Sequence, residues 1–160
     1  MTEVKNGFLS LKPEIYWEQL SPGMRFRTTR RTVTEADLVA FVNLTWLHEE
    51  LFTLADPDAR ATMSIPGRVV PGGLVYTFAE GLLGPSLQAG GLAFLHAEMN
   101  VHGPTLVGDS IQVHCEVIEH RASSKPGKGM VRTRNQVLNQ RGEVVMTYSP
   151  LRLMRRQGAM

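Results

Sequence analysis

The sequence has little cysteine, few aromatic residues and almost no imbalance of charge. Its single cysteine, Cys115, has no partner for an internal disulfide, and aromatic residues make up 7% of the 160 residues. Seventeen lysines and arginines stand against 15 aspartates and glutamates, giving a formal net charge of +2. So small an excess does not indicate nucleic acid or an anionic membrane as a partner. Cys115 lies in an alternating apolar run, where we expect a buried and inert thiol.

Long apolar runs are also missing. No stretch reaches the roughly 18 residues that a membrane-spanning helix needs. Residues 1–14 contain acidic and polar breaks instead of an apolar run of signal-peptide length. We therefore expect a soluble, cytoplasmic protein that does not associate with membranes.

The composition present is that of a globular protein, with 42% hydrophobic and 20% charged residues. At this length a single domain can bury enough apolar surface to fold without a disulfide or a metal. We interpret residues 1–23 as an irregular N-terminal arm, held to the body by Tyr16 and Trp17. Residues 24–156 then form one domain.

The first half of that domain begins with a strand predicted over residues 24–33. A helix follows, capped by Thr34 with Asp37 at its third position, and it is expected to end near Leu44. Residues 45–72 contain several prolines and glycines and are predicted to form a long, ordered but irregular connection over the body.

Residues 73–83 form the most informative segment. They predict a helix that is apolar on nearly every side, with Glu80 as its only charged residue, and Gly84-Pro85 is expected to end it. A helix of this kind must be buried on most sides. Glu80 then needs a polar partner, or a place at a subunit interface or pocket wall.

The second half predicts strands only. Each segment alternates apolar and polar residues, which is typical of a strand with one covered face. An antiparallel sheet curled around the apolar helix is an α+β arrangement, and its open side would be covered most simply by a second copy. The predicted strands span residues 92–101, 110–120, 131–138 and 143–153, the last two joined by a hairpin at 139–142.

Four motifs carry a resemblance to a known family. TEADLVAFVNLT at 34–45 resembles the family's segment before its catalytic Gly-Asp-x-Asn-Pro-x-His motif, and GRVVPGGL at 67–74 resembles its Arg-Ile-Ala-His-Gly-x-Leu segment. FAEGL at 78–82 resembles its central helix, and VHGPTLVGDS at 101–110 its Gly-Asp-Thr strand connection. The chain thus resembles the MaoC-like, (R)-specific enoyl-CoA hydratase/dehydratase family. The resemblance implies a hotdog fold, an acyl-CoA or related thioester as ligand, and a homodimer or higher homo-oligomer.

The resemblance departs from the family at the catalytic positions. In an ungapped alignment, Leu47 stands where the family has its catalytic aspartate and Phe52 where it has its catalytic histidine. Pro71 replaces the histidine that precedes the glycine at the start of the central helix. A gapped alternative places His48 on the catalytic histidine but deletes the aspartate motif.

The remaining candidates for proton transfer lie in the same connection. His48, Glu49 and Glu50 are consecutive, and a carboxylate in an apolar pocket beside Trp46 and Phe52 would have a raised pKa. Hydration needs such a base and acid within hydrogen-bond reach of the substrate. The alternative is that these three side chains face solvent.

Gly72 and Gly73 are the candidates for substrate binding. The resemblance implies that a backbone N–H at the amino end of the central helix holds the thioester carbonyl. Free donors and the helix dipole favour negative charge there. This device needs no side chain, so the replacements at Leu47 and Phe52 leave it intact. The alternative is a tight turn that contains two glycines.

Three functions stay open at this point. The first is an enoyl-CoA hydratase or 3-hydroxyacyl-CoA dehydratase with a non-standard site, and the second is a subunit that binds an acyl thioester without turnover or supports an active partner. The third is a thioesterase in which Glu49, Glu50 or Glu80 activates water. No histidine pair has a metal-ligand spacing, so we expect neither a metal nor a cofactor apart from the CoA of the substrate.

Overall fold

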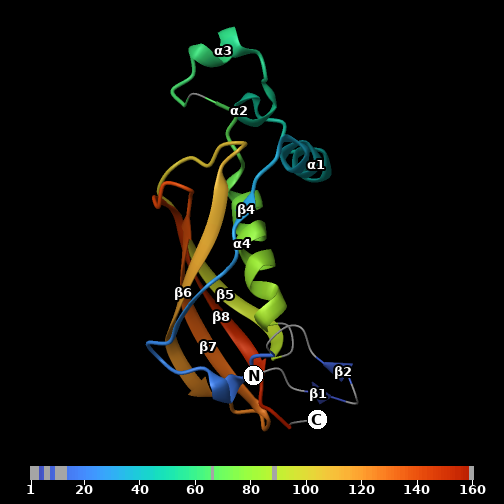
Figure 1. Cartoon of the computed structure of the whole chain (residues 1–160), viewed down its shortest axis with the longest axis vertical. Helices are drawn as coiled ribbons and strands as arrows, with labels where there is room; N and C mark the ends of the chain where they lie inside the picture. The colour runs from blue at the N-terminus through green and yellow to red at the C-terminus, as the bar shows by residue number, and fades with distance from the viewer. Residues whose placement is uncertain (1–3, 6–7, 10–13, 66, 88–89, 159–160) are drawn as a thin grey trace.

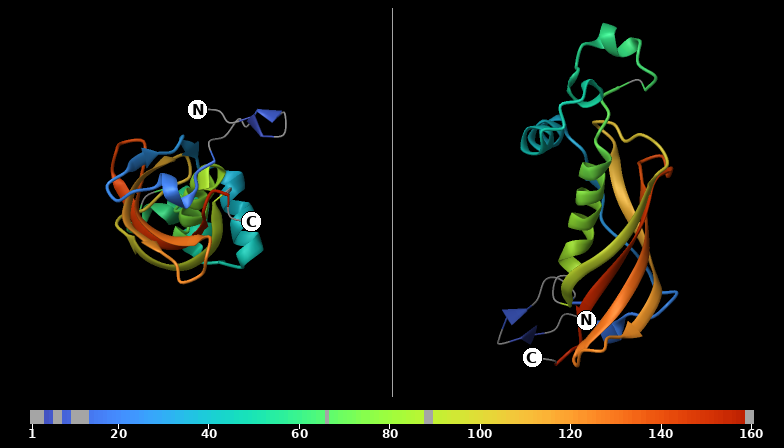
Figure 2. Two further views of the ribbon diagram at one scale, coloured as in Figure 1. Left: turned by 90° about the horizontal axis from the view of Figure 1, so that it is seen from below. Right: turned by 180° about the vertical axis from the view of Figure 1, so that it is seen from behind.

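In the computed structural model, the described residues are 4–5, 8–9, 14–65, 67–87 and 90–158. An antiparallel sheet wraps around one long helix, α4 (Gly72–Leu87), as the views in Figures 1 and 2 show. The strand order in the main sheet is β3-β6-β7-β8-β5, and β4 also pairs with β6. The strands of this sheet are β3 (Arg25–Arg27), β4 (Arg31–Thr32), β5 (Gly91–Val101), β6 (Ser110–Ala122), β7 (Lys128–Leu138) and β8 (Val144–Arg155).

The remaining elements are short or lie outside the sheet. A two-stranded ribbon and a 3-10 helix come first, and three helices precede α4. Their bounds are β1 (Val4–Lys5), β2 (Phe8–Leu9), η1 (Trp17–Gln19), α1 (Glu35–Thr45), α2 (Glu50–Thr53) and α3 (Pro57–Ala61). None of the described helices has the length and apolar character needed to cross a membrane.

The predicted start of α1 is confirmed. The Thr34 side chain accepts a hydrogen bond from the Asp37 backbone N–H, and the Asp37 carboxylate accepts one from the Thr34 N–H. This reciprocal pair satisfies two backbone donors at the helix start. The backbone hydrogen bond from Thr34 is the main reason why the pKa of Asp37 is lowered. The helix ends at Trp46, which adopts a left-handed conformation with φ of 61°.

The central helix α4 is buried on the side that faces the sheet, whereas Gly73, Thr77, Gly81 and Pro85 are exposed in the single chain. The helix also runs four residues past its predicted end. Gly84 and Pro85 lie inside it. Proline lacks the N–H that would bond to residue 81, and its ring crowds that turn. Gly81 and Gly84 both have open space around the position of a Cβ atom, and burial of Leu87 holds the last turn against the sheet.

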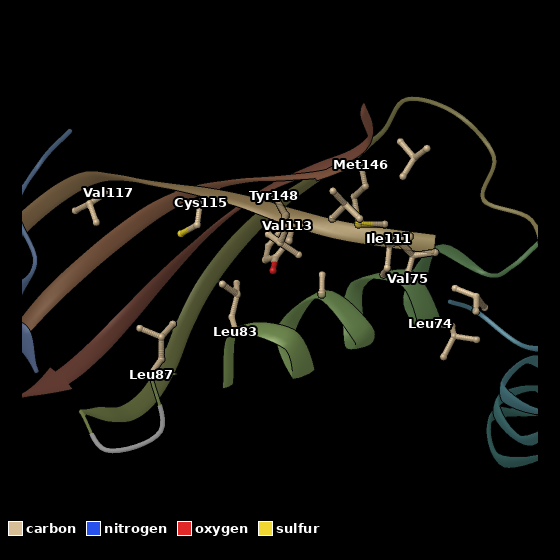
Figure 3. Close-up of a cluster of buried hydrophobic side chains, with 14 of the residues drawn as sticks. Leu74, Val75, Leu83, Leu87, Ile111, Val113, Cys115, Val117, Met146 and Tyr148 are labelled. Carbon is tan, nitrogen blue, oxygen red and sulfur yellow. The ribbon is translucent and has the colours of Figure 1, made fainter. Parts of the chain in front are cut away.

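One continuous apolar core joins α4 to the inner face of the sheet (Figure 3). Alternate residues of each central strand point inward, as the period of two requires. The contributors labelled in Figure 3 are Leu74, Val75, Leu83 and Leu87 from α4, Ile111, Val113, Cys115 and Val117 from β6, and Met146 and Tyr148 from β8.

Two predicted segments are organised differently from expectation. The strand expected over 24–33 is divided into β3 and β4, because only residues 25–27 and 31–32 form ladder pairs with β6. The connection at 45–72 is not wholly irregular, since it contains α2 and α3. Asp56 caps α3 by accepting hydrogen bonds from two backbone N–H groups. Both short helices lie beyond the end of the sheet (Figure 1).

Strand β5 forms an edge of the sheet, and none of its residues is buried. The regular alternation predicted for this strand, which would put Phe94 and Met99 on opposite faces, is interrupted. A register shift between Phe94 and His96 exchanges the faces, so that Phe94 pairs with Arg152 and contacts Tyr76 of α4. Met99 pairs with the buried Tyr148. Phe94 therefore borders α4, and Met99 lies on the same face of β5.

Tyr16 and Trp17 attach to the body as predicted. Tyr16 is buried, and the Trp17 indole stacks on His120 with ring centres 4.0 Å apart. The approach is so close that a Cβ atom on Gly129 would lie 2.1 Å from the indole nitrogen. The division into an arm at 1–23 and a separate domain at 24–156 stays a prediction.

Because the Cys115 thiol is buried, the free energy of unfolding depends on pH in the alkaline range. Burial raises the pKa of Cys115 to about 12, so the folded state holds a proton that the unfolded state releases near pH 9. The stabilisation is complete below pH 9 and is lost as the pH rises toward 12, by up to about 1.4 kcal/mol per pH unit. We expect Cys115→Ala to lose less stability than the unmodified chain between pH 8 and pH 11. Urea unfolding at both pH values measures this, and equal losses would contradict it.

Candidate functional site

A cavity of about 250 Å³ lies at the amino end of α4. It is bordered by α2, the start of α4, the end of β5 with the loop that follows, and β8. The described lining residues carry apolar side chains, apart from glycines and the threonine hydroxyl. They are Leu51, Phe52, Ile65, Val69, Val70, Gly72, Val75, Val101, Gly103, Pro104, Thr105, Val145 and Met146.

A short antiparallel contact positions the chain before α4. The Val70 N–H donates to the Thr105 carbonyl over 2.8 Å, and the Val107 N–H donates to the Arg68 carbonyl over 2.9 Å. Val69 also bridges to Leu106. These bonds join the segment before the helix to the loop after β5, so that both line the same cavity.

The first turn of α4 leaves two backbone donors free. The Pro71 carbonyl accepts hydrogen bonds from the N–H groups of Leu74 and Val75, over 3.0 and 3.2 Å. The N–H groups of Gly72 and Gly73 donate to no acceptor within the described residues. Free donors of this kind are the normal state of a helix start and suit an oxygen that bears negative charge.

The two glycines differ in their surroundings. Gly72 lines the cavity, and a Cβ atom there would lie 3.5 Å from Val101 Cγ2 and 3.8 Å from Met146 Cε. Gly73 is not among the lining residues, and a Cβ atom there would instead lie 3.5 Å from Phe41. The substrate-binding role of both glycines stays a prediction.

His48, Glu49 and Glu50 are exposed and do not line the cavity. The His48 ring lies edge-on to the exposed Trp46, and Glu49 is the N-cap of α2. The three side chains are therefore near one another only because they are consecutive in the chain, and the structure does not gather them at the cavity. Their catalytic role stays a prediction.

The positions aligned with the family's catalytic pair are informative. Phe52, aligned with the histidine, lines the cavity, while Leu47, aligned with the aspartate, is half-exposed and does not. The backbone thus directs residue 52 to the place that the resemblance implies, but the side chain there is a phenyl ring. No ionisable side chain belongs to the described lining.

Sequence reasoning missed the far walls of the cavity. Val101, Thr105, Val145 and Met146 come from β5, its following loop and β8. Met146 is 1% exposed and pairs with Val101 across the two strands. The alternation of β8 could have placed Met146 on the inner face, but only the strand register shows which residues of β5 and α4 it meets.

A polar cluster lies further along α4, toward its carboxyl end. Glu80 accepts two hydrogen bonds from Arg152 Nη2, over 2.5 and 2.7 Å, and one from the Tyr148 hydroxyl over 2.8 Å. Burial, followed by the negative charge of Glu80, raises the pKa of Tyr148. The partner that Glu80 was predicted to need is therefore Arg152, which sequence reasoning did not identify.

Asn135 completes this cluster from β7. Its side chain is fully buried beside Tyr148, its pair on β8, and lies near enough to act on the pKa of that hydroxyl. Neither of its side-chain polar atoms has hydrogen-bond geometry to a described residue.

A larger hollow of about 580 Å³ lies on the outer face of the sheet, between β3, β6 and β7. Its lining is mostly polar or charged, with Phe26 and Cys115 as the exceptions. Arg25 and Arg134 share the carboxylate of Glu116, over 3.5 and 3.9 Å. Such contacts between partly exposed charges are typical of a solvated sheet face. Across the described part of the chain, no group of three or more His, Cys, Asp or Glu residues is placed to hold a metal ion.

The family model for the FAS1-like dehydratase domain region matches residues 21–148. Among solved structures, the monoamine oxidase regulatory protein from Archaeoglobus fulgidus is similar over 91% of this chain and 97% of its own, with 28% identity and a TM-score of 0.79. The (R)-hydratase from A. caviae involved in PHA biosynthesis is similar over 84% of this chain and 96% of its own, with 25% identity and a TM-score of 0.70.

A Mycobacterium tuberculosis protein with a double hotdog fold is similar over 92% of this chain and 46% of its own, with 23% identity and a TM-score of 0.78. This likeness shows the fold alone, and it confirms the predicted hotdog architecture. No curated protein matches the chain significantly.

The ion pair between Glu80 and Arg152 leads to a prediction about stability. We expect Arg152→Met to lower the free energy of unfolding by about 3 kcal/mol, because it leaves the Glu80 carboxylate largely buried without its cation. The double variant Arg152→Met with Glu80→Leu removes both charges and is expected to recover most of that loss. Urea unfolding at pH 7 measures both. A double variant no more stable than Arg152→Met would contradict this account of the pair.

Proposed function

This chain belongs to the FAS1-like dehydratase family, a MaoC-like hotdog family, and we propose that it binds the acyl part of a CoA-type thioester. The observation that carries this proposal is the cavity at the amino end of α4, whose apolar lining includes Gly72, one of the two free backbone donors in the first turn of the helix. A thioester offers the matching chemistry, a hydrocarbon chain next to a polarisable carbonyl.

The carbonyl oxygen is assigned to the N–H groups of Gly72 and Gly73. Gly72 lines the cavity, and its missing side chain lets a ligand approach the backbone closely. Two such donors at a helix start stabilise the partial negative charge of a thioester oxygen without any side chain. The acyl chain then extends toward Val75 and Met146.

None of the described lining residues has an ionisable side chain that could transfer a proton. Hydration or dehydration needs a base and an acid beside the α- and β-carbons, and Phe52 occupies the position aligned with the family's histidine. We therefore infer an acyl-thioester-binding subunit of the hydratase/dehydratase type. Turnover would require ionisable groups from outside this lining.

Two alternatives are distinguished by specific observations. Hydration by His48 with Glu49 or Glu50 is favoured by their position directly before Leu51 and Phe52, which line the cavity. Thioester hydrolysis by Glu80 is disfavoured, because its carboxylate is held by Arg152 and lies outside the cavity lining.

A second copy of the chain is the proposed partner. Strand β5 has a free edge, and apolar side chains along it are exposed, among them Leu95 (49%) and Met99 (48%). An exposed apolar edge favours pairing with another strand. Next to this edge, the exposed positions of α4 are Gly73, Thr77, Gly81 and Pro85. The first three are small, so a second α4 could approach closely there.

Binding is tested with three glycine variants of α4. Gly72→Pro removes one N–H at a helix position that tolerates proline, whereas Gly72→Ala adds a comparable Cβ atom and keeps the donor. We expect butyryl-CoA to bind Gly72→Pro about fivefold more weakly than Gly72→Ala, since a hydrogen bond contributes about 1 kcal/mol. Gly84→Ala, on the same helix with open space around it, is the unaffected control. Isothermal titration gives the dissociation constants.

The same samples separate the candidate functions. The chain alone is expected to bind butyryl-CoA and butyryl-pantetheine more tightly than free CoA, and to leave the enoyl absorbance of crotonyl-CoA unchanged. Loss of that absorbance, abolished by Glu49→Gln or His48→Ala, would replace the proposal by the hydratase alternative. Release of free thiol would favour a thioesterase, and binding no tighter than that of free CoA would refute the acyl assignment.

The proposed pairing is tested by sedimentation equilibrium. We expect the unmodified chain to sediment at twice its mass of 17.8 kDa. The double variant Leu95→Lys with Met99→Lys is expected to sediment as a monomer, because it places charges along the edge. His114→Lys, on an exposed position of β6, is the control. A monomeric unmodified chain, or an unchanged dimer in the double variant, would contradict the β5 interface.

A further inference from the structure

The inner end of the cavity is closed by two fully packed side chains. Met146 of β8 is 1% exposed and Val75 of α4 is 2% exposed, and both line the cavity. Both belong to the end of the core at the start of α4, and Tyr148 lies farther from that end (Figure 3). These two residues form the floor of the cavity.

We propose that this floor restricts the chain to short acyl groups of about four to six carbons, and that Met146 is the residue that sets the limit. The proposal rests on the acyl-binding function proposed above and specifies its substrate class. It follows from three observations, namely the volume of the cavity, the packing of its floor and the chemistry of the residues beneath it.

The volume sets the first bound. One water molecule takes up about 30 Å³ of liquid, and a methylene group is of similar size, so the cavity holds roughly eight such groups. The carbonyl carbon, oxygen and sulfur of the thioester take up about three of these places. The remaining space accommodates an acyl chain of about six carbons, counting the carbonyl carbon, without displacement of protein atoms.

The packing of the walls gives the second bound. Val70, Thr105 and Val145 surround the inner part of the cavity and are each no more than 4% exposed. A longer chain therefore cannot pass these three walls, and it must displace Met146 to go deeper. The exposed wall at Val101 leads back to solvent. Methionine has three flexible torsions, but in this position it fills the space between Val75 and the strand pair β5–β8.

The residues beneath the floor add a chemical barrier. The next inward residue of β8 is Tyr148, whose ring lies edge-on to Tyr76 at 5.1 Å and whose hydroxyl donates to Glu80. Glu80 is bound in turn by Arg152. A hydrocarbon chain that passed Met146 would have to separate these groups and leave buried polar atoms unpaired, which is unfavourable.

The test compares saturated acyl-CoA thioesters of two to twelve carbons, with free CoA as the reference. We expect affinity for the unmodified chain to rise from acetyl-CoA to hexanoyl-CoA. Dodecanoyl-CoA is then expected to bind at least about tenfold more weakly than hexanoyl-CoA. Isothermal titration of the full chain measures each dissociation constant.

Met146→Ala is expected to raise the limit on acyl-chain length. It removes about three heavy atoms from the floor, so octanoyl-CoA is expected to bind about tenfold more tightly than to the unmodified chain, while butyryl-CoA changes little. Met154→Ala is the matched control, because Met154 is also 1% exposed on β8 but does not line the cavity. Val75→Ala enlarges the inner end of the cavity from the helix side. It replaces Met146→Ala as the test variant if Met146→Ala does not fold.

The outcomes distinguish this proposal from the function on which it rests. If no acyl-CoA binds more tightly than free CoA, both are refuted. If dodecanoyl-CoA binds as tightly as hexanoyl-CoA, acyl binding stands and the length limit is refuted. The role of Met146 is refuted if folded Met146→Ala and Val75→Ala both retain the preference of the unmodified chain.

Discussion

The apolar side of α4 lies against the inner face of the sheet, and the position of every candidate site residue depends on this contact. Leu74, Val75, Ala79 and Leu83 are each no more than 3% exposed, and a fully buried side chain of this size contributes about 1.5–3 kcal/mol. Because the sheet curls around the helix, the amino end of α4 is fixed where β5, β8 and the segment before the helix converge. The cavity forms at that point.

The same arrangement separates two environments along one helix. At the first turn, Gly72 and Gly73 offer backbone donors next to apolar walls. About two turns later, Glu80 is held by Arg152 and Tyr148. The first environment suits a neutral, polarisable ligand, whereas the second is already satisfied by the protein itself. This difference explains why acyl binding is better supported than chemistry at Glu80.

The sequence predicted the fold well because its strongest patterns act locally. Thr34 and Asp37 indicate a helix start through adjacent backbone groups, and the apolar segment around Leu74–Leu83 requires burial whatever covers it. The end of α4 was misjudged because Leu87 holds the last turn through tertiary contacts despite Pro85. Arg152, Met146 and the face of Phe94 depend on strand register and on one β-bulge, which periodicity alone does not reveal.

The central claim is that the free N–H groups at the start of α4 hold a thioester carbonyl. Backbone amide NMR of ¹⁵N-labelled chain titrated with butyryl-CoA tests this most directly. The account predicts that the proton resonances of Gly72 and Gly73 move downfield as they donate hydrogen bonds, while those of Gly81 and Gly84 stay in place. Saturable binding of butyryl-CoA that leaves Gly72 and Gly73 unshifted would contradict it.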